Sequence, residues 1–340
     1  MVPLNDLDHI SGYVDKKIDT DIYYDDEKYD KHGRISFIGK EKDIFEPYIL
    51  NENLIHPEDK DFSVVLSHDV DDLDSNILHL GASFLFFHKY KNPKILMKFI
   101  REYLKNTKTY DNFDKIIEIE NRYDAKSTFF FLSNSSDPIR ERYKISDVKE
   151  SIGEKIVDKG FEVGLHTGYY SYDDASMVKK EKNDLEKTLN ITIEGARNHF
   201  LRFKGKKSWE VLSEAGLQYD SSYGYHNMIG FKEGIGYPFY PVLREGKRIL
   251  EIPLNIMDGT LFDYMKLSPK EAWEKIERLL KATKRNNGVL SVLWHNATFS
   301  YPIRHPWIKV YEKILSWAYR NNGYLSDCSS IKKYFDRLNR

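Results

Sequence analysis

The feature that most constrains this chain is a repeated alternation of short apolar runs with longer amphipathic segments after residue 60. Runs such as FSVVLS, STFFFL and VLSVLW have the length and the β-branched or aromatic content of buried strands. Segments such as SPKEAWEKIERLLKATKR space their apolar residues as one face of a helix does. Strands that alternate with helices predict a parallel sheet, because each helix returns the chain to the same end of the sheet.

We therefore predict an α/β fold for residues 61–340, a distorted TIM-like (β/α) barrel of about seven strands. An open, doubly wound sheet fits the same alternation. Residues 77–123 are predicted to be mainly helical. Residues 1–60 are polar and lack sustained periodicity, so we expect an N-terminal extension or cap that packs on the barrel, with a turn and short strand in DKHGRISFIGK.

Composition narrows the classes of function and location. Charged residues make up 31% of the chain but cancel to a net charge of −1, so no global field favours nucleic acid. The single cysteine, Cys328, excludes an internal disulfide framework and fits a reducing compartment. The N-terminus shows no signal-peptide pattern, and no apolar stretch is long enough to span a bilayer. A cytoplasmic protein without a membrane span is the expectation.

Polar clusters follow the predicted strands, each at the point where a strand ends. They are HDVDD, HTGYY, RNHF, DSS, IMD and WHN. In an α/β barrel, the carboxyl ends of the strands meet at the edge where catalytic groups converge. The clusters therefore predict a functional site at this edge.

The residue types in these clusters suit metal-assisted hydrolysis. Asp71 and His166 offer the oxygen and nitrogen that a divalent ion accepts. Asp69 would then be free to remove a proton from the attacking water, and His295 could donate a proton to the departing amine. Arg197 could pair with Asp69 and orient it.

Each of these residues also has a structural interpretation. An Asp cluster after a strand can cap a helix. His166 and His199 could satisfy only structural hydrogen bonds, and Trp294 could belong to the core. The conjunction of all these clusters at one edge of the barrel favours the functional interpretation.

The motifs resemble those of the polysaccharide deacetylase superfamily, the carbohydrate esterase family four and its relatives with NodB homology. SHDVDD resembles the first motif, EVGLHT the second and LWHN the last, while ARNHF occupies the place of the third and STFFFL that of the second strand. The resemblance covers residues 60–325. It implies a deacetylase barrel in which Asp69 is the base, Asp71 and His166 bind metal, Arg197 partners Asp69, and His295 is the acid.

The sequence departs from the family pattern at the second motif. A second metal-binding His usually follows the first by four residues, and this position is Tyr170 here. Either another residue completes the site, for which we choose His199, or metal affinity is weakened and activity is altered or absent. The resemblance implies Zn²⁺ as the metal, with Co²⁺ or Ni²⁺ as substitutes. Substrate contacts are assigned to Tyr170, Trp294 and Asp258.

The leading hypothesis is a metal-dependent hydrolase that removes an N-acyl group, most simply acetyl, from an amino sugar, sugar nucleotide or oligosaccharide in surface-polysaccharide metabolism. A cytoplasmic location would favour a glycan precursor. The alternative is a catalytically inactive carbohydrate-binding or assembly protein on the same fold, which Tyr170 motivates. A metal-free glycoside hydrolase is disfavoured, because Asp69 and Asp71 share one loop and cannot flank a glycosidic bond.

Overall fold

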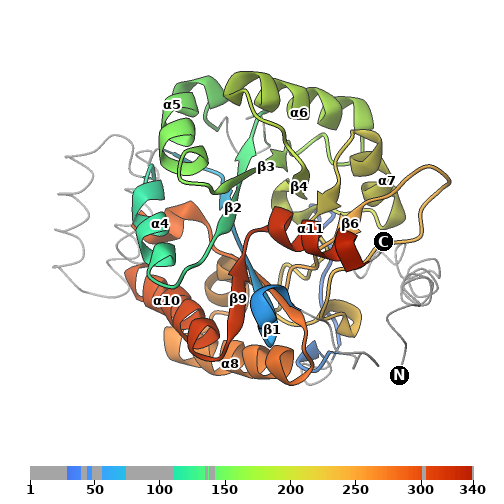
Figure 1. The fold of residues 1–340 in the computed structure, drawn as a ribbon. Coiled ribbons are helices and arrows are strands. Elements are labelled where there is room, and N and C mark those ends of the chain that lie inside the picture. The colour runs from blue at the N-terminus through green and yellow to red at the C-terminus, as the bar shows by residue number, and fades with distance from the viewer. Residues whose placement is uncertain are drawn as a thin grey trace.

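The computed structural model describes residues 29–39, 44–47, 56–73, 110–134, 137, 142–300 and 304–338. One curled parallel sheet forms its centre, and helices surround the sheet (Figure 1). The strand order is β6-β5-β4-β3-β2-β1-β8-β7, and β9 also pairs with β1. The predicted α/β barrel is confirmed, and the open doubly wound sheet is wrong.

The elements have the following bounds. The strands are β1 (Phe62–Val70), β2 (Ser127–Leu132), β3 (Glu162–Thr167), β4 (Gly195–Asn198), β5 (Tyr219–Asp220), β6 (Leu250–Glu251), β7 (Ile256–Met257), β8 (Val289–Leu293) and β9 (Gly323–Ser326). The α-helices are α4 (Phe113–Asn121), α5 (Lys149–Ile152), α6 (Ala175–Leu189), α7 (Lys206–Glu214), α8 (Pro269–Arg285), α9 (Asn296–Ser300), α10 (His305–Arg320) and α11 (Cys328–Leu338). Single-turn 3₁₀ or π segments are η3 (Pro57–Asp59), η4 (Ile145–Val148), η5 (Gly153–Val157), η6 (His199–Leu201), η7 (Lys232–Gly234) and η8 (Thr260–Tyr264).

The sheet has nine strands in the described residues rather than about seven, and one reason is a proline. The segment RILEIPLNIMD, predicted as one strand, forms β6 and β7 with Pro253 between them. Ile252, just past β6, still donates its N–H to Asp220 O of β5, at 2.8 Å. Asn255 donates its N–H to Ser291 O of β8, at 3.3 Å. This segment therefore bridges the two edges of the sheet and nearly closes the barrel. The other added strand, β9, is short and was not predicted.

The interior of the barrel is partly polar. Alternate residues of a strand face the same side of a sheet. Arg197 of β4 lies over the ring of Phe130 of β2, with 4.7 Å between the guanidinium carbon and the ring centroid. Gly164 of β3 makes room for this ring, because an added Cβ would lie 2.5 Å from it. The guanidinium is thereby held inside the barrel, below the carboxyl ends of the strands.

Local sequence signals fix the helix ends. Asp174 caps α6 by accepting from the N–H groups of the first turn, and Asn190 ends this helix with a left-handed φ of 57°. Ser268 and Glu271 form a capping box at the start of α8. The predicted helix over residues 77–123 is described only as α4, since residues 74–109 lie outside the described part of the chain. No helix in the described ranges is long and apolar enough to cross a membrane.

The described parts of residues 1–60 pack on the barrel. Arg34 forms an antiparallel bridge with Arg202, and Phe203 donates its N–H to Gly33 O at 3.0 Å. Phe45 is fully buried. In the DKHGRISFIGK segment the predicted turn is present, but the predicted strand is reduced to single bridges. The domain boundary at residue 60 stays a prediction.

Candidate active site

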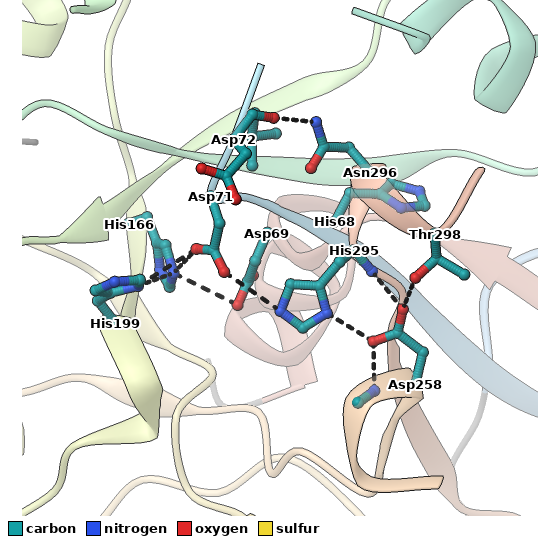
Figure 2. A network of polar contacts seen from close by, with 12 residues as sticks. His68, Asp69, Asp71, Asp72, His166, His199, Asp258, His295, Asn296 and Thr298 are labelled. Atoms are coloured by element: carbon teal, nitrogen blue, oxygen red, sulfur yellow. Dashed lines mark hydrogen bonds and ion pairs between the residues drawn. The ribbon is translucent and has the colours of Figure 1, made fainter. Parts of the chain in front are cut away.

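Residues from five of the six polar clusters converge at one edge of the sheet, as Figure 2 shows for Asp69, His166, His199, Asp258 and His295. Strand β1 runs through His68 to Val70, further than the apolar pattern indicated, because these residues pair with β2. Asp69 therefore lies on the strand and Asp71 just beyond it. His166 lies on β3, and His295 follows β8 by two residues.

Asp71, His166 and His199 form a compact cluster of three metal-ligand types. Asp71 Oδ1 lies 3.3 Å from His166 Nε2 and 3.3 Å from His199 Nδ1. The two ring nitrogens are 3.0 Å apart. All three side chains point toward one another from the loop after β1, from β3 and from the turn after β4 (Figure 2).

The cluster fits a divalent ion such as zinc. With bond lengths of about 2.0–2.1 Å, the ligand atoms of a tetrahedral zinc site lie roughly 3.3 Å from one another. His166 Nδ1 lies 2.9 Å from the carbonyl oxygen of Arg197 and donates to it, which leaves Nε2 with a lone pair. Asp71 Oδ1 is buried and accepts no hydrogen bond from the described part of the chain. A cation between these atoms would satisfy them together.

The electrostatics of the cluster also call for a positive charge at its centre. Burial alone would raise the pKa of Asp71, but the charge of His199 and the contacts with both imidazoles hold it well below its usual range. Burial alone would lower the pKa of His199, but the negative charges of Asp71 and Asp137 raise it. A carboxylate and two imidazoles at this spacing thus hold either a proton or a metal ion.

Asp69 is held by the buried guanidinium of Arg197. Arg197 Nη1 donates to Asp69 Oδ1 at 3.0 Å and to Ser67 Oγ at 2.8 Å. Its other donors reach Ser221 O and Ser221 Oγ, both at 2.8 Å. Because four hydrogen bonds fix the guanidinium, Asp69 keeps one orientation, with Oδ2 3.6 Å from His166 Nε2. The second carboxylate oxygen thus faces the metal cluster.

His295 lies on the opposite side of Asp71 and has its own carboxylate. His295 Nδ1 is 2.6 Å from Asp258 Oδ1, and Thr298 donates its hydroxyl to Asp258 Oδ2. His295 Nε2 points back to Asp71 Oδ2, at 3.7 Å (Figure 2). Burial would lower the pKa of His295, but the charge of Asp258 and its hydrogen bond, followed by Asp71, raise it to about 9. This raised pKa favours the protonated imidazole at neutral pH.

The three predicted substrate contacts stay predictions, although two of these side chains are fully buried. Trp294 is fully buried and packs against Tyr311, with 5.5 Å between ring centroids. Asp258 is also fully buried and is occupied by His295, Thr298 and its neighbouring backbone. Its role is to hold His295. Tyr170 is 53% exposed and packs edge-on against Tyr169.

The structure adds site residues that the sequence analysis missed. Asn296 donates its amide to Asp72 O at 2.8 Å, which fixes the loop after β1 (Figure 2). Thr298 could have been found from its position three residues after His295. Asp137 lies 3.6 Å from His199 and is bound by Arg142. Asp137 follows β2 at the same edge of the barrel, and this placement was the available signal.

Solved structures share this fold. A protein of Mycobacterium smegmatis assigned to the polysaccharide deacetylases matches with a TM-score of 0.59 at 15% identity, covering 86% of this chain and 96% of that one. The Puue allantoinase matches with a TM-score of 0.59 at 14% identity, covering 84% and 94%. A Pseudomonas aeruginosa protein assigned to the polysaccharide deacetylases matches with a TM-score of 0.56 at 14% identity, covering 85% and 95%.

No protein-family model matches the sequence, and no curated protein matches it. The resemblance to polysaccharide deacetylases is confirmed at the level of the fold by structures that are 14–15% identical to this chain. One of these matching structures is named for allantoin and two for polysaccharides, so the shared fold does not by itself select a substrate.

Proposed function

We propose that this chain is a metal-dependent hydrolase that removes an N-acyl group, most simply acetyl, from an amino sugar or glycan precursor in surface-polysaccharide metabolism. The observation that carries the proposal is the meeting of Asp71, His166 and His199 beside two further groups, Asp69 and His295. Three ligands, a base and an acid within one edge of a barrel are the parts that amide hydrolysis needs.

Each side chain has a distinct part in the proposed reaction. Asp71, His166 and His199 would hold a divalent ion, with zinc as our choice and cobalt or nickel as substitutes. When bound, the ion would polarise the acyl carbonyl and make a water molecule more acidic. Asp69, oriented by Arg197, would accept the proton of this water through Oδ2.

Proton donation falls to His295. The amide C–N bond breaks as the water oxygen bonds to the acyl carbon, and the departing amine needs a proton. His295 holds one, because its pKa is raised to about 9. The hydrogen bond of Nδ1 to Asp258 directs Nε2 toward the reacting centre. The products are a carboxylic acid and a free amino sugar.

The test is amine release from N-acetylated substrates. Protein loaded with zinc or cobalt is incubated with N-acetylated sugar nucleotides and oligosaccharides, and new primary amines are quantified. The Asp69→Asn variant, loaded with the same metal, is the control. Release by the unmodified protein alone would support the proposal. No release from any substrate, with metal demonstrably bound, would instead favour a carbohydrate-binding or assembly protein without catalysis.

A further inference from the structure

One buried carboxylate lies behind the proposed ligand His199 and takes no part in the reaction described above. Asp137 Oδ2 lies 3.6 Å from His199 Nε2, and the two side chains are 1% and 2% exposed. The other ring nitrogen, His199 Nδ1, faces Asp71 and His166. Asp137 therefore lies on the side of the imidazole away from the metal cluster.

The two histidines of the cluster present different nitrogens to its centre. His166 donates from Nδ1 to the carbonyl oxygen of Arg197, so its Nε2 faces Asp71. His199 has the reverse arrangement, with Nδ1 inward and Nε2 outward. An imidazole can bind a metal only through an unprotonated nitrogen, so each ring needs an acceptor on its outer nitrogen. Arg197 O is that acceptor for His166.

Asp137 is the carboxylate that faces the outer nitrogen of His199. Within the described residues, His199 Nε2 makes no hydrogen bond, although it is buried. A buried N–H without an acceptor loses the hydrogen bond that it makes with water in the unfolded chain, which is costly. A modest approach of the Asp137 carboxylate would convert the ion-pair contact into a hydrogen bond and fix the proton on Nε2.

Arg142 holds Asp137 in place and links it to the other side of the cluster. Arg142 Nε donates to Asp137 Oδ2. Its Nη1 lies 3.3 Å from both carboxylate oxygens of Asp72, the residue after Asp71. The guanidinium is 7% exposed. One arginine thus connects the carboxylate behind His199 with the loop that carries Asp71.

We propose that Asp137 is a positioning residue that fixes the tautomer of His199 and so makes it a metal ligand, and that Arg142 holds Asp137 for this role. The inference rests on the proposed metal site. It explains how a chain with Tyr170 in place of a ligand histidine can still present a third ligand. Asp137 is not itself a fourth ligand, because it faces the nitrogen of His199 that points away from the cluster.

The first test measures zinc affinity in a matched pair of variants. Asp137→Asn and Asp258→Asn each remove the charge of a carboxylate that faces a histidine. Competition with a chromophoric chelator gives the zinc dissociation constant. We expect Asp137→Asn to weaken zinc binding by about 10- to 100-fold, the range of outer partners of metal-bound histidines. We expect Asp258→Asn to bind zinc like the unmodified protein.

The outcomes separate this inference from the proposed function. If the unmodified protein fails to bind zinc, the proposed function fails and the inference fails with it. If the unmodified protein binds zinc and Asp137→Asn binds it equally well, only the role of Asp137 is overturned. Equal weakening by Asp258→Asn would also overturn it, since the effect would then not be specific to His199.

A second test needs no variant, so it does not depend on how a variant folds. Zinc-loaded full-length protein with ¹⁵N-labelled histidine is studied by long-range ¹H–¹⁵N correlation spectroscopy, which distinguishes the two ring nitrogens. We expect one zinc-bound histidine to be protonated on Nδ1, as His166, and the other on Nε2, as His199. Two zinc-bound histidines with the same tautomer would overturn the proposal.

Discussion

Two histidine–carboxylate pairs flank Asp71, and they differ in ways that suit different chemistry. On one side His199 Nε2 lies 3.6 Å from Asp137, and the imidazole is 2% exposed. On the other side His295 Nδ1 lies 2.6 Å from Asp258, and the imidazole is 22% exposed. The residue types are the same in both pairs. The distances, the burial and the nitrogen that faces the carboxylate are different.

The proposed role of each histidine follows from the surroundings of the ring nitrogen that does not face its paired carboxylate. His199 Nδ1 faces a second imidazole and a carboxylate within 3.3 Å, a geometry that one shared cation satisfies. His295 Nε2 is 3.7 Å from the nearest carboxylate and belongs to a partly exposed side chain. In the proposed reaction the substrate approaches this second nitrogen. The comparison supports the proposal that one pair holds an ion and the other delivers a proton.

The largest expected effect comes from Asp69, which belongs to neither histidine–carboxylate pair. We expect Asp69→Asn to lower kcat by roughly 10²- to 10⁴-fold, the usual contribution of a general base. Metal content should be unchanged, because Asp69 is not among the three clustered ligands. Single-turnover assays with metal analysis test this. Retained turnover would mean that one of the histidines removes the proton from water. The division of roles between the two histidine–carboxylate pairs would then be wrong.

The second prediction compares alanine variants of His199 and His295. We expect His199→Ala to weaken zinc binding by more than the roughly 100-fold that an outer partner contributes. We expect His295→Ala to keep zinc but to lose turnover. Tyr170→Phe is the control for the cluster and should bind zinc normally, since Tyr170 is exposed and lies outside it. Zinc titration and activity assays on the same preparations decide, and equal zinc loss in both alanine variants would contradict the division of roles.

The third prediction concerns pH. The pKa of His295 is raised from 6.5 to about 9, since the charge of Asp258 outweighs burial. Asp258→Asn removes this charge and leaves burial, which lowers the pKa. Because the reaction needs protonated His295, the alkaline limb of the kcat–pH profile should move to lower pH in this variant. An unshifted alkaline limb would show that Asp258 does not control the proton of His295.

The smallest effect concerns a carboxyl group without a histidine. Glu162, which accepts hydrogen bonds from Tyr219 and Thr128, has its pKa raised from 4.5 to about 8, by burial and then by the charge of Asp327. The folded protein therefore keeps a proton that the unfolded chain releases above pH 4.5. The stabilisation from this proton is complete below pH 4.5 and is lost as pH rises through 8.

Glu162→Gln keeps the group neutral at every pH. We expect the free energy of unfolding to fall less steeply between pH 5 and 8 in this variant, by at most about 1 kcal/mol per pH unit. Urea unfolding across this range measures the slope. A slope equal to that of the unmodified protein would contradict the prediction. It would mean that Glu162 is already ionised in the folded protein across this pH range, as Asp258 is with its lowered pKa.

The alternation of strands and helices was readable from the sequence because burial imposes a period on apolar residues. The runs that form β2 and β8 are mainly apolar, as strands covered on both faces require. Shorter strands were harder. The four residues of β9 carry no comparable run, and the break between β6 and β7 depends on pairing with two different neighbours.

The sequence by itself determined that Asp69, Asp71, His166, Arg197 and His295 would lie at one edge, because parallel strands bring their carboxyl ends together. It also offered His199 as a third ligand. Only the tertiary structure decided which nitrogen of each imidazole faces the cluster. It also decided which side chains contact and orient other side chains of the site.

Asp258 and Trp294 illustrate that limit. Both follow strands at the edge of the sheet that carries the candidate site. Asp258 is nevertheless fully buried behind His295, and Trp294 is fully buried in the core. Strand periodicity places a residue at an edge but does not give the side chains that surround it. Those surroundings come from segments far apart in the chain, such as Asp137 beside His199, and packing alone brings them into contact.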